Sequence, residues 1–158
     1  MSPGLARKLT AEALGTGLLV ATVVSGRLAL LATRMNDTIM KAMHEPALAD
    51  HAQALARALQ RVGAATKAAW STGNPTEALA NATPYLQAFG HTVIAWIWLD
   101  VALCAQAKLG QGGDEAALRG KLAACRFFYR HDLPKVAAWL KPVASRDDTC
   151  RTMDEAWF

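Results

Sequence analysis

The chain has 158 residues, of which 53% are hydrophobic and 19% charged, and its formal net charge at pH 7 is +4. A chain of this length forms one domain with a substantial apolar core. Its basic residues are scattered and lack the interleaved aromatic residues of a nucleic-acid-binding surface, so we expect no nucleic acid as a partner.

The composition favours helices along the whole chain. Alanine is abundant, only six residues are proline, and no segment alternates apolar and polar residues next to a glycine or asparagine turn. We therefore expect an all-α fold, a helical bundle of about four to five helices with an extra apolar helix at the N-terminus.

The first 27 residues differ from the rest and are expected to form a separate segment, with the helical domain over residues 28–158. An uncharged run of 14 residues extends from Ala13 to Gly26, whereas about 20 are needed to span a bilayer. A signal peptide is an alternative, and so is a membrane tether over residues 9–31. The stretch "KLTAEALGTGLLVATVV" resembles the first membrane helix of aquaporin-type channels. The two Asn-Pro-Ala signatures of a channel are missing, so the resemblance does not imply channel activity.

Two amphipathic helices are predicted next. Apolar residues at steps of three or four predict a helix over residues 28–43 that ends before Pro46. Pro46 is expected to begin a second helix that ends near Gly73. This helix carries one apolar seam, made of Leu48, Ala52, Leu55, Leu59, Val62, Thr66 and Ala69.

A long central helix follows. Asn74-Pro75-Thr76-Glu77 is a helix start signal, and Pro84 either kinks this helix or starts a new one. The central helix is expected to stop at Gly110. Its uncharged run from Ala78 to Leu99 is long enough to span a membrane, but polar residues would then lie in lipid. We predict instead a helix buried on nearly all sides. Phe89, Val93, Trp96 and Leu103 would share one side, Leu86, Ile94, Ile97 and Val101 would cover much of the rest, and Gly90 would permit close approach by a neighbour.

The last long helix is expected to begin at Asp114-Glu115, with Leu133-Pro134 breaking it before a short amphipathic segment that ends at Leu140. Its inward residues would be Leu118, Leu122, Cys125, Phe128 and Tyr129, while Arg119, Arg126 and Arg130 share another side.

The sequence contains no recognisable catalytic motif. The motifs HxxxH, HExxH and GxSxG are absent, as is a phosphate-binding glycine loop. Cys104, Cys125 and Cys150 form no CxxC pair, so we expect no metal site, no disulfide framework and a reducing cytoplasm. The pattern favours His91 as a core histidine over a ligand or general base. A small-molecule cavity near His91, Trp96 and Trp98 is a further hypothesis.

Three segments in order carry a resemblance to a known family. They are "YLQAFGHTVIAWIWL" at residues 85–99, "GKLAACRFFYRHDLP" at 120–134 and "MDEAWF" at 153–158. Together with the upstream helices they resemble the C-terminal helical domain of the larger acyl-CoA dehydrogenases over roughly residues 30–158. That family oxidises acyl-CoA to 2,3-enoyl-CoA in fatty acid β-oxidation, with FAD as the electron acceptor.

The resemblance implies an accessory domain without catalysis of its own. FAD, the thioester and the catalytic carboxylate belong mainly to a preceding catalytic region, so no catalytic residue is carried over and this chain alone is expected to bind no cofactor. Its expected partner is an acyl-CoA dehydrogenase core or a second copy, with Trp96 and Trp98 filling the bundle. A solvated face is favoured for Arg119, Arg126 and Arg130 over contact with a core domain or CoA phosphates. The alternative function is a membrane-tethered helical bundle with an interaction role.

Overall fold

The computed structural model describes residues 27–157, and the N-terminal segment predicted as an extra apolar helix lies almost wholly outside them. The elements are α2 (Arg27–Met43), α3 (Ala49–Ala69), α4 (Pro75–Leu79), α5 (Ala82–Lys108), α6 (Glu115–His131), α7 (Lys135–Ser145), α8 (Thr149–Thr152) and the short 3-10 helix η1 (Glu155–Trp157). No strand occurs between residues 27 and 157, so the all-α prediction is confirmed.

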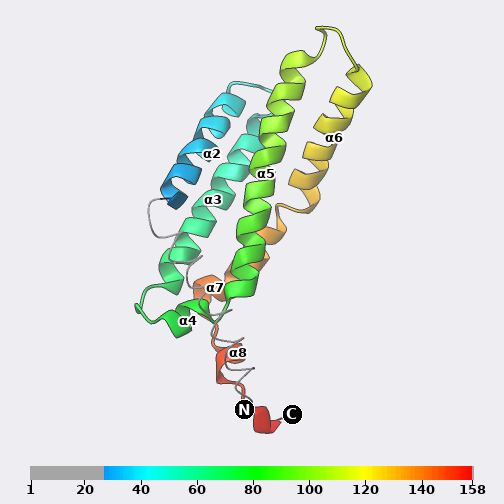
Figure 1. Ribbon diagram of the computed structural model, residues 1–158. Helices are drawn as coiled ribbons and strands as arrows, with labels where there is room; N and C mark the ends of the chain where they lie inside the picture. Colours follow the sequence, from blue (N-terminus) through cyan, green and yellow to red (C-terminus); the bar gives the residue numbers. More distant parts are fainter. Residues whose placement is uncertain (1–26, 158) are drawn as a thin grey trace.

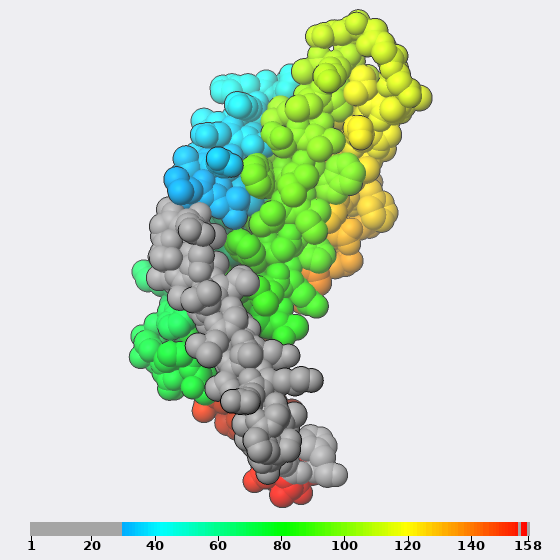
Figure 2. All heavy atoms as spheres, viewed as in Figure 1, coloured from blue at the N-terminus to red at the C-terminus, as the bar shows by residue number. Residues whose placement is uncertain are grey.

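The four long helices lie side by side and each runs antiparallel to the one before it (Figure 1). α5 packs against α2, α3, α6 and α7, which makes it the central helix of the bundle. Figure 2 shows α5 in the middle of the visible face, between α2 and α6. α7 lies across one end of the bundle, where it contacts α3 and α5, and α8 extends beyond that end.

The predicted helix boundaries are close to those observed, with three exceptions. α3 ends at Ala69 rather than near Gly73. α3 begins at Ala49 rather than at Pro46, because the amide groups of Leu48 and Ala49 both donate to the carbonyl of Glu45 in a turn that precedes it. α7 continues to Ser145 rather than ending at Leu140, with Pro142 inside it. Pro84 lies in the first turn of α5, where a missing N–H costs nothing, so it belongs to the start of a new helix.

Small residues fill the centre of the bundle. α5 buries Tyr85, Ala88, Thr92, Ala95, Leu99, Ala102 and Ala105, which recur at steps of three and four. Such a pattern is the seam of a coiled-coil-like packing. Since four of these seven residues are alanine, the neighbouring helices can approach α5 closely. Leu55, Val62 and Met35 supply the larger side chains from α3 and α2.

Candidate functional site

The prediction that α5 is buried on nearly all sides is wrong. Leu86, Ile94 and Ile97 are 37%, 41% and 50% exposed. With the half-buried Gly90 and Val101, they recur at steps of three and four and therefore share one face of the helix. We name these five residues the α5 stripe. The four helices that contact α5 cover its other sides, and none of the elements between residues 27 and 157 covers this one.

The α5 stripe also explains why α5 has the composition of a membrane helix. Among residues 27–157, α5 is the one helix that is long and apolar enough to cross a bilayer by length and composition, and 33% of its most apolar window is buried. A core helix of a soluble protein satisfies the same criterion when it is mostly buried, whereas most of this window is not buried inside the described bundle. Here the apolar residues serve two surfaces, the buried seam and the α5 stripe.

Gly90 lies within the α5 stripe and has open space beside it. A β-carbon built on Gly90 meets no atom within 4 Å, so the close approach predicted at this position is not made by the described part of the chain. A glycine inside a helix costs about 0.5–1 kcal/mol relative to alanine. No contact within residues 27–157 offsets that cost.

Trp96 joins α5 to α2. Its indole N–H donates a hydrogen bond of 2.8 Å to Oγ1 of Thr38, which is 6% exposed. The Thr38 hydroxyl donates in turn to the carbonyl oxygen of Arg34. The indole ring is partly buried and packs against the core. Trp96 thus has a structural role between two helices.

His91 joins α5 to α6 and α7. Its Nδ1–H donates to the carbonyl oxygen of Gln87 at 2.9 Å, and its ring lies 4.5 Å from the ring of Trp139 and 6.0 Å from that of Phe128. The pKa of the neighbouring Asp132 carboxyl is lowered, chiefly by a hydrogen bond from Lys135, with a smaller contribution from the charges of His91 and His131. His91 is half-buried, so these contacts give it a structural role at the edge of the core rather than inside it.

The structure does not bring His91, Trp96 and Trp98 into one cavity. Residues two apart on a helix point about 200° apart, so Trp96 and Trp98 face nearly opposite sides of α5. Trp96 contacts α2, whereas His91 contacts α6 and α7. The hypothesis of a ligand cavity shared by these three residues is therefore wrong.

The arginines of α6 are exposed, as the favoured interpretation of a solvated face requires. Arg119 pairs with Glu115 at 3.1 Å on the surface of the same helix. Arg119 and Arg126 also line a cavity of about 230 Å³, which Arg130 does not line. His51 of α3 and Gln106 of α5 line the same cavity, and sequence reasoning did not select them. No spacing pattern connects these residues, because they come from three different helices.

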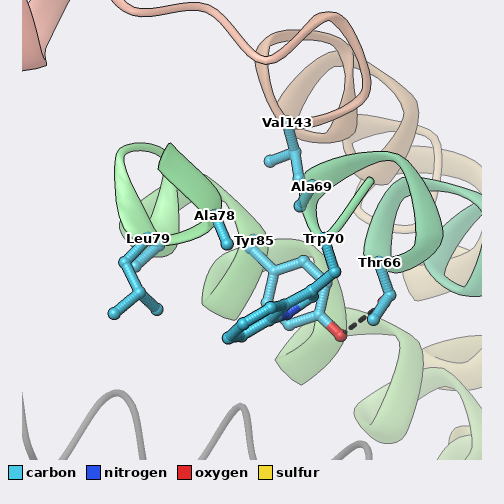
Figure 3. A pocket seen from close by; sticks show the side chains of 8 residues that line it. Thr66, Ala69, Trp70, Ala78, Leu79, Tyr85 and Val143 are labelled. Atoms are coloured by element: carbon cyan, nitrogen blue, oxygen red, sulfur yellow. Dashed lines mark hydrogen bonds between the residues drawn. The ribbon is translucent and has the colours of Figure 1, made fainter. Parts of the chain in front are cut away.

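Two further hollows have structural roles. In the first, the hydroxyls of Thr66 and Tyr85 lie 2.8 Å apart beside Trp70 (Figure 3). Burial raises the pKa of Tyr85, and the hydrogen bond with Thr66 partly opposes this. The hollow has a volume of about 10 Å³. This is roughly the space needed for one water molecule, so the hollow is too small for a ligand.

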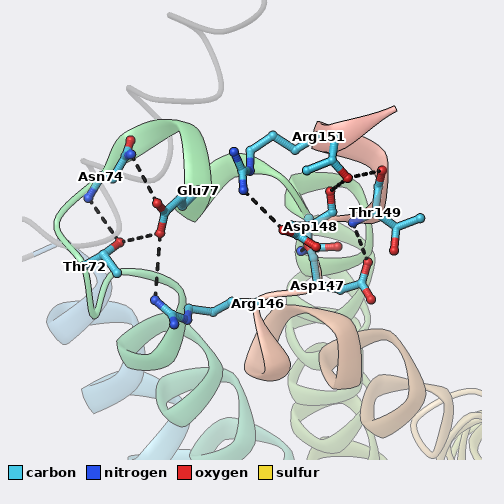
Figure 4. Close-up of polar contacts among 10 residues, drawn as sticks. Thr72, Asn74, Glu77, Arg146, Asp147, Asp148, Thr149 and Arg151 are labelled. Atoms are coloured by element: carbon cyan, nitrogen blue, oxygen red, sulfur yellow. Dashed lines mark hydrogen bonds and ion pairs between the residues drawn. The ribbon is translucent and has the colours of Figure 1, made fainter. Parts of the chain in front are cut away.

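The second hollow is polar and lies between α4 and the start of α8 (Figure 4). Glu77 accepts a hydrogen bond from Thr72 at 2.9 Å and pairs with Arg146 at 3.9 Å. The side chain of Asn81 donates to the carbonyl oxygen of Asp147 at 2.7 Å. Acidic and basic groups pair with each other here, so this network fixes α4 against the chain that follows α7.

The three cysteines differ in exposure and are therefore expected to differ in thiol reactivity. Cys104 and Cys150 are exposed, whereas Cys125 is buried and burial raises its pKa to about 11. The thiolate is the reactive form. We expect two thiols of the native protein to react rapidly with an aromatic disulfide reagent at pH 8, and Cys125 to react only after unfolding in guanidinium. A Cys125→Ala control should give two reactive thiols in both conditions. Rapid reaction of all three native thiols would contradict the burial of Cys125.

Comparison with known protein families shows which family the chain belongs to. Residues 31–154 match the family described as acetyl-CoA dehydrogenase C-terminal like. The chain belongs to this family. The predicted resemblance over roughly residues 30–158 is thereby confirmed. The matched range begins in α2 and ends after α8, so the whole described bundle forms the C-terminal-like domain.

A curated relative agrees with this assignment. The domain is 33% identical over 97 residues to butyryl-CoA dehydrogenase of Syntrophomonas wolfei subsp. wolfei, and the alignment covers 59% of this chain and 16% of the relative. The chain thus spans about one sixth of the length of that relative. No solved structure matches it significantly. The described bundle is thus an accessory C-terminal domain of the acyl-CoA dehydrogenase type.

Proposed function

We propose that this domain packs against the catalytic region of an acyl-CoA dehydrogenase through the α5 stripe and has no catalytic activity of its own. FAD binding, thioester recognition and oxidation of acyl-CoA to 2,3-enoyl-CoA in fatty acid β-oxidation would belong to that catalytic region. The chain itself would bind no flavin. We also propose a cytoplasmic location, supported by its three free cysteines.

The observation that carries the proposal is the inverted distribution of side-chain size on α5. The buried seam contains Ala88, Ala95 and Ala102, while the exposed face carries Ile94 and Ile97. An isolated bundle gains more from burying isoleucine than alanine, since burial stabilises in proportion to apolar area. A contiguous exposed apolar face marks an interaction surface. In a family of accessory domains, the catalytic region is the partner that such a face fits.

The proposal can be tested by recovery of the tagged 158-residue chain from its native cells, with and without mild detergent. We expect an acyl-CoA dehydrogenase catalytic chain with bound flavin to be co-purified, identified by mass spectrometry and flavin absorbance. Ile97→Glu should reduce this recovery at least tenfold, because it places a charge in an apolar interface. The matched control is Gln60→Glu, which adds the same charge at an exposed position of α3.

Gly90 provides a second variant at the same surface. Gly90→Ala should stabilise the isolated chain by about 0.5–1 kcal/mol and at the same time weaken recovery of the partner if a partner helix packs against the open space. Gly63→Ala in α3, which also has open space beside it, should stabilise without changing recovery. Equal recovery by wild type and Ile97→Glu would overturn the proposed interface. Recovery only of lipid or membrane proteins, lost with detergent, would instead support a membrane-bound bundle.

A further inference from the structure

A cavity of about 230 Å³ is lined by residues from the start of α3, the end of α5 and one side of α6. Figure 1 shows the start of α3 and the end of α5 at the same end of the bundle. The cavity contains no residue of the α5 stripe, so its role is independent of the docking proposed above. Its polar lining groups are His51, Gln106, Arg119 and Arg126, and Leu48 and Leu122 supply apolar surface.

The cavity has a surplus of positive charge. Arg126 forms no ion pair with any residue between 27 and 157, whereas Arg119 shares its charge with Glu115 at 3.1 Å. The pKa of His51 is lowered first by burial and further by the charge of Arg126, while Asp50 opposes the shift. This shift favours the neutral form of the His51 ring, which offers a hydrogen-bonding group without a further charge.

Two features hold these groups in place. The ring of His51 lies 4.6 Å from the ring of Tyr129, whose buried hydroxyl donates to the carbonyl oxygen of Ala95 at 3.0 Å. His51 also lies in the first turn of α3, a helix of 21 residues. The positive end of the helix dipole lies at this turn and favours anions, and Asp50 in the same turn partly opposes it.

We propose that this cavity binds a small molecule through its phosphate group, with a short apolar chain lying against Leu48 and Leu122. A phosphate offers three terminal oxygens and up to two negative charges. It can therefore accept hydrogen bonds from Arg126 and Arg119 and balance both of their charges, whereas a carboxylate brings two oxygens and only one charge. The cavity volume fits a compact ligand of this kind.

The test is a titration of the full 158-residue chain with n-butyl phosphate, inorganic phosphate and butyrate, followed by NMR of the His51 ring and the Gln106 side-chain amide. We expect saturable shifts at both groups, with butyl phosphate binding tightest. Arg126→Gln should weaken binding of butyl phosphate about tenfold, which is the effect of losing one charge-assisted hydrogen bond. Arg130→Gln is the matched control, because Arg130 is an exposed arginine of the same helix outside the cavity.

Three results would overturn the inference. Equal weakening by Arg126→Gln and Arg130→Gln would mean a diffuse attraction to a basic surface. Butyrate binding as tightly as butyl phosphate would assign the cavity to carboxylates. The absence of saturable shifts at His51 and Gln106 would mean that no phosphate group binds here. None of these results depends on whether the α5 stripe docks on a catalytic region.

Discussion

Replacing Leu99 by alanine is expected to lower the free energy of unfolding by about 2–5 kcal/mol, the range measured for leucine deletions in well-packed cores. Leu99 is fully buried and lies in the seam of α5 between Ala95 and Ala102. Its alanine neighbours are too small to fill the space that it would leave. The variant should therefore fall in the upper part of this range, measured as a shift of the urea midpoint at constant slope.

Ile97→Ala is the control for Leu99→Ala, because it removes aliphatic carbons two residues away on the same helix. Ile97 is 50% exposed, so its loss should change the stability of the isolated chain by less than about 1 kcal/mol. Comparable losses in the two variants would contradict the assignment of the buried and exposed faces of α5. The pair of variants thus tests the orientation of the central helix without requiring a partner.

That orientation is what the sequence did not predict. The seam of α3 was found from the spacing of Leu55, Val62 and Ala69, because polar residues occupy the other sides of that helix. α5 is apolar on both its buried and its exposed faces. The spacing of its apolar residues therefore does not indicate which face is buried. Total burial was the simplest prediction from such a pattern. Exposure of the α5 stripe depends on how many helices surround α5, which a local pattern does not contain.

The ends of the helices were easier to predict than their contacts. Asn74 and Asp114 cap α4 and α6, and each side chain accepts a hydrogen bond of 3.0 Å from a backbone amide. The local sequence predicted the helix start at Asn74, and it predicted Asp114 as an acidic residue at the beginning of its helix. Capping depends on residues within one turn. The cavity of about 230 Å³ depends instead on the packing of three helices, which brings His51, Gln106 and Arg126 together. The sequence placed Arg126 on a shared side of its helix, but the position of His51 opposite it follows from the packing of α3 on α6.

Replacing Thr38 by valine is expected to destabilise the bundle by about 1–3 kcal/mol, the cost of leaving a buried donor without an acceptor. Valine has nearly the shape of threonine, so packing around residue 38 would change little. The indole N–H of Trp96 would lose the acceptor that it contacts at 2.8 Å in a partly buried site between α2 and α5. Thr38→Ser, which keeps the hydroxyl and removes one methyl group, should retain most of the stability, as measured by urea unfolding.

A double-mutant cycle separates this hydrogen bond from packing. Trp96→Phe removes the donor and should also be destabilising, because the indole packs against the core. In the double variant Thr38→Val with Trp96→Phe, no donor is left unpaired. We therefore expect the double variant to lose less stability than the sum of the losses measured for the two single variants. Strict additivity would mean that the bond does not couple α2 to α5. Coupling would mean that Trp96 holds α2 in place at the edge of the α5 stripe, and that changes in α2 alter the surface proposed to meet the catalytic region.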